Sequence, residues 1–142
     1  MRVEKIEGVF GFTAYVVEDL NFKHWLFRPV EDLIEQNFVL EYYTDSSKVK
    51  EIIFAFQIEP EPVFFKLTNR FAYKKGIIFL YGKIDYETFK NATEQEALAL
   101  MCESYLEAIL TIPSLRGMKK IAFDAQKLHQ DLRNMFLEKG FL

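Results

Sequence analysis

The chain has 142 residues, a length typical of one folded domain, and half of them are hydrophobic, including 15 phenylalanines. This composition excludes a disordered chain and predicts a single domain over residues 1–142 with an aromatic core. The net charge of −3 gives no general attraction to nucleic acid, and no run approaches the ~18 apolar residues of a membrane span, so we expect neither partner.

Two elements are predicted in the first 40 residues. Val9–Val17 alternates between its two faces with apolar residues on both, which predicts a central strand. A short helix should follow with Pro29 in its first turn, and it should end near Asn37.

Strand patterns continue to residue 84. One apolar face of a strand is formed by Ile52, Phe54, Phe56 and Ile58. Pro60 stops that run, and Val63–Leu67 is a further candidate strand. The turn Lys74–Gly76 should join Arg70–Tyr73 to Ile77–Ile84 as a hairpin. We therefore expect an antiparallel meander in which aromatic residues such as Phe79 and Tyr81 pack in the core rather than stack on nucleic-acid bases.

A long helix should begin at Thr93, because Thr93 and Glu96 have the spacing of a capping box. Its apolar face contains Ala97, Leu98, Met101, Tyr105, Ala108, Ile109 and Ile112. Pro113 ends the pattern, so the helix should be about 30 Å long and cross the sheet.

A C-terminal helix should be capped by Asp124 and end before Gly140, and a short tether after Pro113 makes it a neighbour of the long helix. Its apolar stripe is Ala125, Leu128, Leu132, Met135 and Phe136. The predicted fold is α+β, with an antiparallel sheet of about four to six strands packed against the long helix and the C-terminal helix.

Charge is unevenly distributed along the chain. Residues 85–112 have a net charge of −5, whereas residues 113–142 have a net charge of +3. Glu96, Glu103 and Glu107 fall on the polar side of the long helix, where Glu103 and Glu107 repel each other by ~0.2–0.5 kcal/mol. These three glutamates are the best candidates for a partner-binding surface, although solubility explains the same pattern.

Motifs for catalysis or cofactor binding are not found in the sequence. A single cysteine, Cys102, excludes an internal disulfide, and the two histidines have no metal-ligand spacing. We expect no catalytic residue, no metal and no cofactor. His129 should lie at the edge of the last helix's apolar stripe, and His24 and Trp25 could line a pocket. The N-terminal residues lack the apolar segment of a signal peptide, which favours a cytoplasmic protein.

Residues 77–136 resemble the C-terminal half of bacterial immunity proteins from polymorphic-toxin and contact-dependent growth inhibition systems, especially immunity protein 44. The similar features are a strand ending in KIDYETF at Lys83–Phe89, a polar helix start at Asn91–Gln95, a long leucine-rich helix and FDAQKLHQDL at Phe123–Leu132. The resemblance implies a non-enzymatic bacterial protein that binds and blocks a cognate toxin domain, often a nuclease, so the acidic set would mimic a phosphate backbone.

Two other classes of function remain open from the residues alone. The chain could be a small-ligand-binding or enzymatic α+β domain with a pocket near His24 and Trp25. It could also be a non-catalytic scaffold subunit that only forms oligomers. The oligomeric state cannot be predicted from the sequence.

Overall fold

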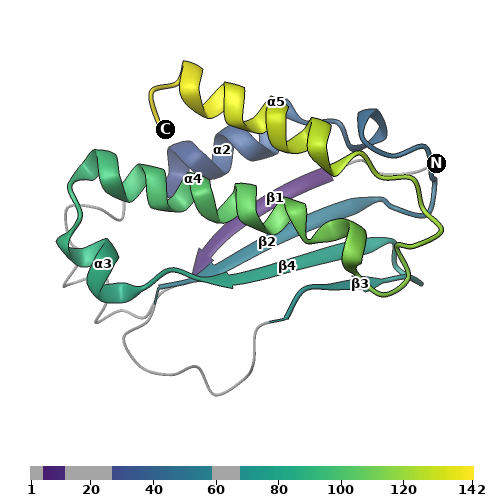
Figure 1. Cartoon of the computed structure of the whole chain (residues 1–142). Helices are drawn as coiled ribbons and strands as arrows, with labels where there is room; N and C mark the ends of the chain where they lie inside the picture. The colour runs from purple at the N-terminus through teal and green to yellow at the C-terminus, as the bar shows by residue number, and fades with distance from the viewer. Residues whose placement is uncertain (1–4, 12–26, 59–67) are drawn as a thin grey trace.

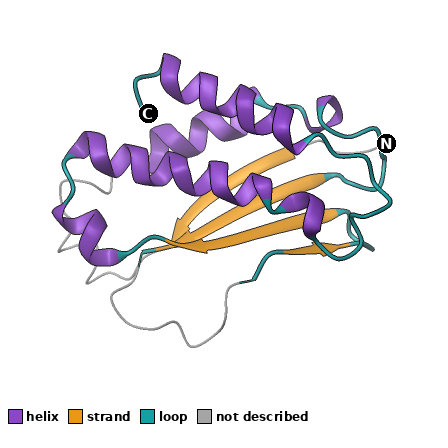
Figure 2. Ribbon diagram, in the orientation of Figure 1, coloured by secondary structure: helices purple, strands orange, loops and turns teal. Residues whose placement is uncertain are grey.

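The computed structural model describes residues 5–11, 27–58 and 68–142. Helices cover one face of a sheet that has four strands in this part of the chain (Figures 1 and 2). The elements are β1 (Lys5–Gly11), α2 (Phe27–Asn37), β2 (Glu51–Gln57), β3 (Arg70–Ala72), β4 (Ile77–Lys83), α3 (Tyr86–Asn91), α4 (Glu94–Leu110) and α5 (Ala125–Glu138). The predicted α+β class is confirmed.

The direction of the strands differs from the prediction. The order is β1-β2-β4-β3; β1 and β4 both run parallel to β2, and β3 is antiparallel to β4. The predicted antiparallel meander is therefore wrong. Parallel neighbours need a crossover of a dozen or more residues, and the chain between β1 and β2, and between β2 and β4, is long enough for one. Alternating burial has the same period in both arrangements and cannot reveal strand direction.

The first strand also lies elsewhere than predicted. β1 begins at Lys5, four residues before the predicted start at Val9, and it forms one edge of the sheet that the structure describes, whereas a central position is predicted. Residues 12–17 lie outside the described residues. Because α2 packs against β1, a position at the edge still gives the strand a covered face.

The centre of the sheet agrees with the predicted pattern. Burial alternates along β2, with Ile52, Phe54, Phe56 and the following Ile58 buried under the helices. The hairpin is also confirmed: the N–H of Gly76 donates to the Ala72 carbonyl at 2.9 Å, and Gly76 has a φ of 69°. Pro60 and the candidate strand Val63–Leu67 lie outside the described residues.

Two aromatic residues of β4 are not in the core. Ile78 and Leu80 are fully buried on the helix-covered face, so Phe79 and Tyr81 point to the opposite face and are only half-buried. Their rings stack 5.9 Å apart, and the Arg70 guanidinium lies 4.4 Å from the Phe79 ring centre. The expectation that both pack in the core is wrong, because helices cover one face alone in the described part of the sheet.

Helix α4 is the central helix of the molecule, and its capping box is confirmed. The N–H of Glu96 donates to the Thr93 hydroxyl, and the Glu96 carboxylate accepts from the Thr93 N–H. Tyr105 is fully buried at the centre of the apolar face, and its ring centre lies 4.8 Å from that of Phe54 and 5.0 Å from that of Phe56. The helix has 17 residues and ends at Leu110, and the predicted end at Pro113 lies in a 3-10 turn at Ile112–Ser114.

Helix α5 packs beside α4, as the tether predicts. The Asp124 carboxylate accepts from the Lys127 N–H at 3.0 Å, and Gly140 follows the helix with a φ of 74°. The Tyr43 hydroxyl donates to Asp131 at 3.2 Å and ties α5 to the segment after α2. Burial, together with the nearby Asp131 carboxylate, holds the Tyr43 pKa above its usual range. Helix α2 ends at Asn37 as predicted and starts two residues before Pro29.

The short helix α3 is not predicted by the sequence pattern. Asp85 and Glu87 resemble polar residues at the end of a strand, but Asp85 is the N-cap of α3 and accepts from the Thr88 N–H at 2.9 Å. Six residues are too few to show a helical period. This helix brings Glu87 alongside α4, which matters for the candidate site.

The segment Glu94–Ser114 is long enough, and its mean hydropathy high enough, to cross a membrane. Its glutamates interrupt the apolar residues, so a search of the sequence for uninterrupted apolar runs does not find it. In the structure this segment buries its apolar face against β2 and β4. A helix with one buried face and a row of exposed glutamates is typical of a core helix in a folded domain.

Candidate functional site

The three predicted glutamates form one exposed row on α4. Glu96, Glu103 and Glu107 are all exposed, on the side away from the buried Tyr105. A rise of 1.5 Å per residue spreads them over about 16 Å along the helix axis. The structure therefore brings the predicted residues onto a single surface, and partner binding by them remains a prediction.

Glu96 has a structural role as well. Its carboxylate accepts from the Thr93 N–H at 3.1 Å, which completes the capping box. Glutamine can make the same hydrogen bond, so a change to glutamine removes the charge and keeps the cap.

A hollow between α3 and α4 contains two of the predicted glutamates and a third carboxylate. Glu87 from α3 lies at this hollow with Glu96 and Glu103 from α4, and Leu100 contributes apolar surface between them. The hollow has a volume of about 540 Å³. We call the four carboxylates Glu87, Glu96, Glu103 and Glu107 the acidic surface. Sequence analysis misses Glu87 because it misses α3; the signal is an aspartate at position 85 followed three residues later by Thr88.

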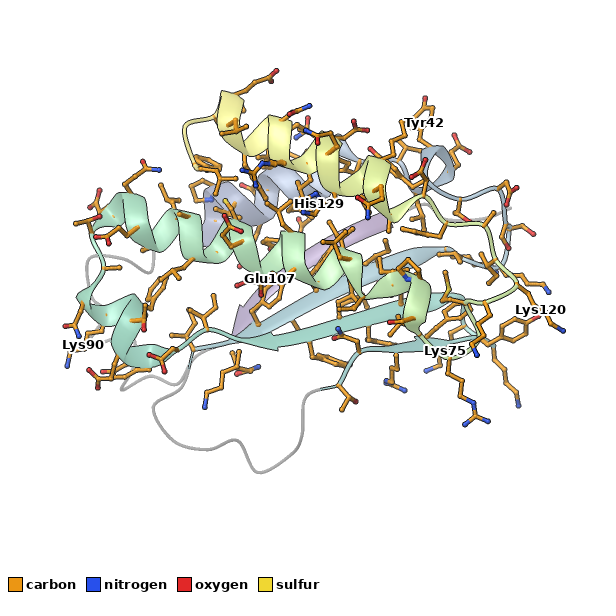
Figure 3. All side chains as sticks on the ribbon, viewed as in Figure 1. Tyr42, Lys75, Lys90, Glu107, Lys120 and His129 are labelled. Carbon is orange, nitrogen blue, oxygen red and sulfur yellow. The ribbon has the colours of Figure 1, made fainter. Side chains whose placement is uncertain are left out.

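Glu107 lies at a second hollow, between α4 and the end of β4. Lys83 and Tyr81 line that hollow together with Asn69. The Asn69 side chain joins the two elements, because its amide donates to the Thr111 hydroxyl at 2.9 Å and its carbonyl accepts from the Tyr81 N–H at 2.7 Å. Glu107 therefore shares its hollow with Lys83, whereas Glu103 shares its hollow with the carboxylates of Glu87 and Glu96. Figure 3 labels Glu107 on α4, in the last turn of the helix before Leu110.

The buried face of α4 provides no reactive group at this surface. Cys102 is fully buried, and burial, with a smaller effect of the neighbouring Glu103 carboxylate, holds the pKa of its thiol well above the usual range. Such a thiol stays protonated and unreactive at neutral pH. Within the described residues, no cluster of three or more His, Cys, Asp and Glu residues could hold a metal ion.

Of the two histidines, one lies within the described residues and one lies outside them. His129 is half-buried on α5, as predicted for the edge of the apolar stripe. His24 and Trp25, which define the alternative ligand pocket, lie outside the described residues.

Three positive charges of the C-terminal part lie away from α3 and from the start of α4. Arg116, Lys119 and Lys120 lie in the connection between α4 and α5, at the far end of α4 from Glu87 and Glu96. In Figure 3, Lys120 and Lys75 lie at one end of the molecule and Lys90 lies at the other. The cations of this connection therefore lie apart from the acidic surface, whereas Lys90 belongs to the same helix, α3, as Glu87.

Comparison with known proteins identifies one family. The family model of immunity protein 44 matches residues 9–138. The match includes the N-terminal half, where the sequence resemblance is weakest. No curated protein and no solved structure shows significant similarity to the chain.

Proposed function

The chain belongs to the immunity protein 44 family, and we propose on this basis that it neutralises a cognate bacterial toxin by stoichiometric binding in the cytosol. The partner is a protein, and the chain performs no catalysis of its own. A nuclease toxin is the partner that the acidic surface fits best, because such an enzyme needs cations where it holds the phosphate backbone.

The observation that carries this proposal is the family match over nearly the whole chain. The acidic surface supports a mechanism. Its four carboxylates are exposed and come from two helices, α3 and α4, that pack together. Glu103 shares its hollow with Glu87 and Glu96, and no lysine or arginine lines that hollow among the described residues. Like charges held this way add little to stability, but they can raise the association rate with a cationic partner by roughly 10–10³-fold.

Replacing three of these carboxylates tests the mechanism. Glu96→Gln, Glu103→Gln and Glu107→Gln in one chain should leave the melting temperature nearly unchanged or slightly higher, because the capping box survives and repulsion is relieved. Association with a basic toxin at low salt should slow by at least about tenfold, with a smaller dependence on ionic strength. Stopped-flow kinetics at low and high salt measure both effects.

A matched control removes three negative charges elsewhere. Glu35→Gln, Asp45→Asn and Glu138→Gln change exposed residues outside the acidic surface, so association should slow much less. An unaltered association rate for the first variant at low salt would rule out the electrostatic mechanism. Neutralisation would then have to use another face of the molecule.

A further inference from the structure

A third hollow, at the opposite end of α4 from α3, has the reverse charge. It is formed by the segment before β2, by β3 with its hairpin turn, and by the connection between α4 and α5, and its volume is about 650 Å³. We call it the basic hollow, and define it by Lys48, Phe71, Tyr73, Arg116, Lys120 and Ile121. Lys120 and Lys75 mark this end of the molecule in Figure 3.

The charge around the basic hollow is of one sign. Segments 46–50, 68–76 and 113–123 together contain eight lysines and arginines and no aspartate or glutamate. The side chains of Lys48, Arg116 and Lys120 are exposed, and no carboxylate of the described residues lines the hollow. In a chain with a net charge of −3, this is a concentrated positive region.

The floor of the hollow is apolar and well supported. Phe71 and Tyr73 meet edge to face with ring centres 5.9 Å apart, and Tyr73 remains 53% exposed. Gly117 lies against Phe71, where an added Cβ would come within 3.3 Å of the ring. The neighbouring backbone is held by a hydrogen bond from the Lys50 N–H to the Gly76 carbonyl at 2.7 Å.

Cations around an aromatic floor fit a ligand that combines negative charge with an apolar group. We propose that the basic hollow binds an acidic segment of a partner protein, with carboxylates on Arg116 and Lys120 and an apolar side chain against Phe71 and Tyr73. Exposed aromatic residues and arginine are the residue types that dominate protein interfaces.

A protein segment fits this hollow better than nucleic acid does. Nucleic-acid sites use a basic groove that follows the backbone over several nucleotides, whereas these cations surround one hollow on an acidic protein. Lys48 is also partly engaged, because its ammonium lies 5.2 Å from the Tyr73 ring centre.

The experiment uses the full chain labelled with ¹⁵N and no toxin, so it is independent of the proposed function. The probe is a short synthetic peptide of alternating glutamate and phenylalanine. Comparison probes are the same peptide with lysine in place of glutamate and a short single-stranded oligodeoxynucleotide. Amide shifts should concentrate at residues 71–73 and 116–121 on adding the acidic peptide, and the lysine peptide should cause none there.

A double variant tests the cations. Arg116→Glu with Lys120→Glu should weaken peptide binding by about tenfold or more, whereas Lys90→Glu with Lys139→Glu, which changes the net charge equally at other exposed sites, should not. Arg116→Ala with Lys120→Ala gives a second pair in case the reversal disturbs folding. Tighter binding of the oligonucleotide through the same amides would overturn the proposal in favour of a nucleic-acid site. Shifts elsewhere, or no binding of the peptide, would also overturn it.

Discussion

Tyr105 is the residue on which the packing of α4 depends most directly. Its fully buried ring contacts Phe54 and Phe56 of β2 and lies 6.3 Å from Phe136 of α5, so it joins the sheet to both long helices. Tyr105→Asp would remove these contacts and bury a charge, and it should lower the free energy of unfolding by about 3–5 kcal/mol.

Urea unfolding followed by circular dichroism measures this loss. Glu107→Asp is the control, because it places aspartate on the exposed side of the same helix and should change stability by less than about 0.5 kcal/mol. Equal stability of the Tyr105→Asp variant and the wild type would show that Tyr105 does not face the core.

Asp85 makes the stability of α3 depend on pH. Hydrogen bonds from the backbone and side chain of Thr88 hold the Asp85 pKa below its ordinary value of 3.8. A carboxylate with a lowered pKa stabilises the fold above the unfolded-state pKa, and this contribution is lost as the pH falls through the folded-state pKa. Asp85→Asn keeps an N-cap side chain but not the charge.

The stability difference between wild type and Asp85→Asn should therefore be largest at neutral pH and should shrink as the pH falls below the ordinary aspartate pKa of 3.8. Urea unfolding of both proteins at several pH values measures it. A difference that stays constant, or that grows as the pH falls, would contradict the role of Asp85 as an ionised cap.

At the scale of elements, the hairpin glycine provides a sharp test of the β3–β4 turn. Gly76 and Gly140 both have positive φ, but an added Cβ would lie only 2.6 Å from the Lys48 carbonyl oxygen at Gly76 and would have no neighbour within 4 Å at Gly140. Gly140→Ala should cost roughly 1–2 kcal/mol for the left-handed conformation. Gly76→Ala should cost ~1–3 kcal/mol more, because backbone must move.

Chemical unfolding of the two alanine variants measures that difference. If both variants lose the same free energy of unfolding, the Lys48 backbone does not contact the hairpin at Gly76. One wall of the basic hollow would then be misplaced.

The sequence predicts those elements that carry their own local signals. Thr93 and Glu96 mark the start of α4, Asp124 and Gly140 bracket α5, and Gly76 marks the hairpin, and each is found where expected. Strand direction has no such signal, because it depends on where a connection crosses the sheet. The acidic surface is likewise predictable only in part. The row of glutamates on α4 follows from the helical period, whereas Glu87 reaches this surface because the six-residue helix α3 packs against α4.

At the scale of the whole molecule, α4 separates two charged regions. Helix α4 bears three of the four carboxylates of the acidic surface and α3 bears the fourth, and the chain leaving the C-terminus of α4 contributes to the basic hollow. Both regions lie outside the core that Tyr105 organises, so their charges can change without loss of the fold. This separation suits a protein whose role is binding, since contact surfaces can vary on a constant scaffold.

The central claim is that the chain neutralises a toxin by binding it, and titration of toxin activity tests this most directly. A candidate cognate toxin domain is assayed with increasing amounts of the purified protein; for a nuclease the assay is cleavage of a labelled nucleic acid. Activity should fall in proportion to added protein, reach background at an equimolar ratio and return when the complex is dissociated. Undiminished activity at a large excess, or complete loss far below the equimolar ratio, would contradict stoichiometric neutralisation.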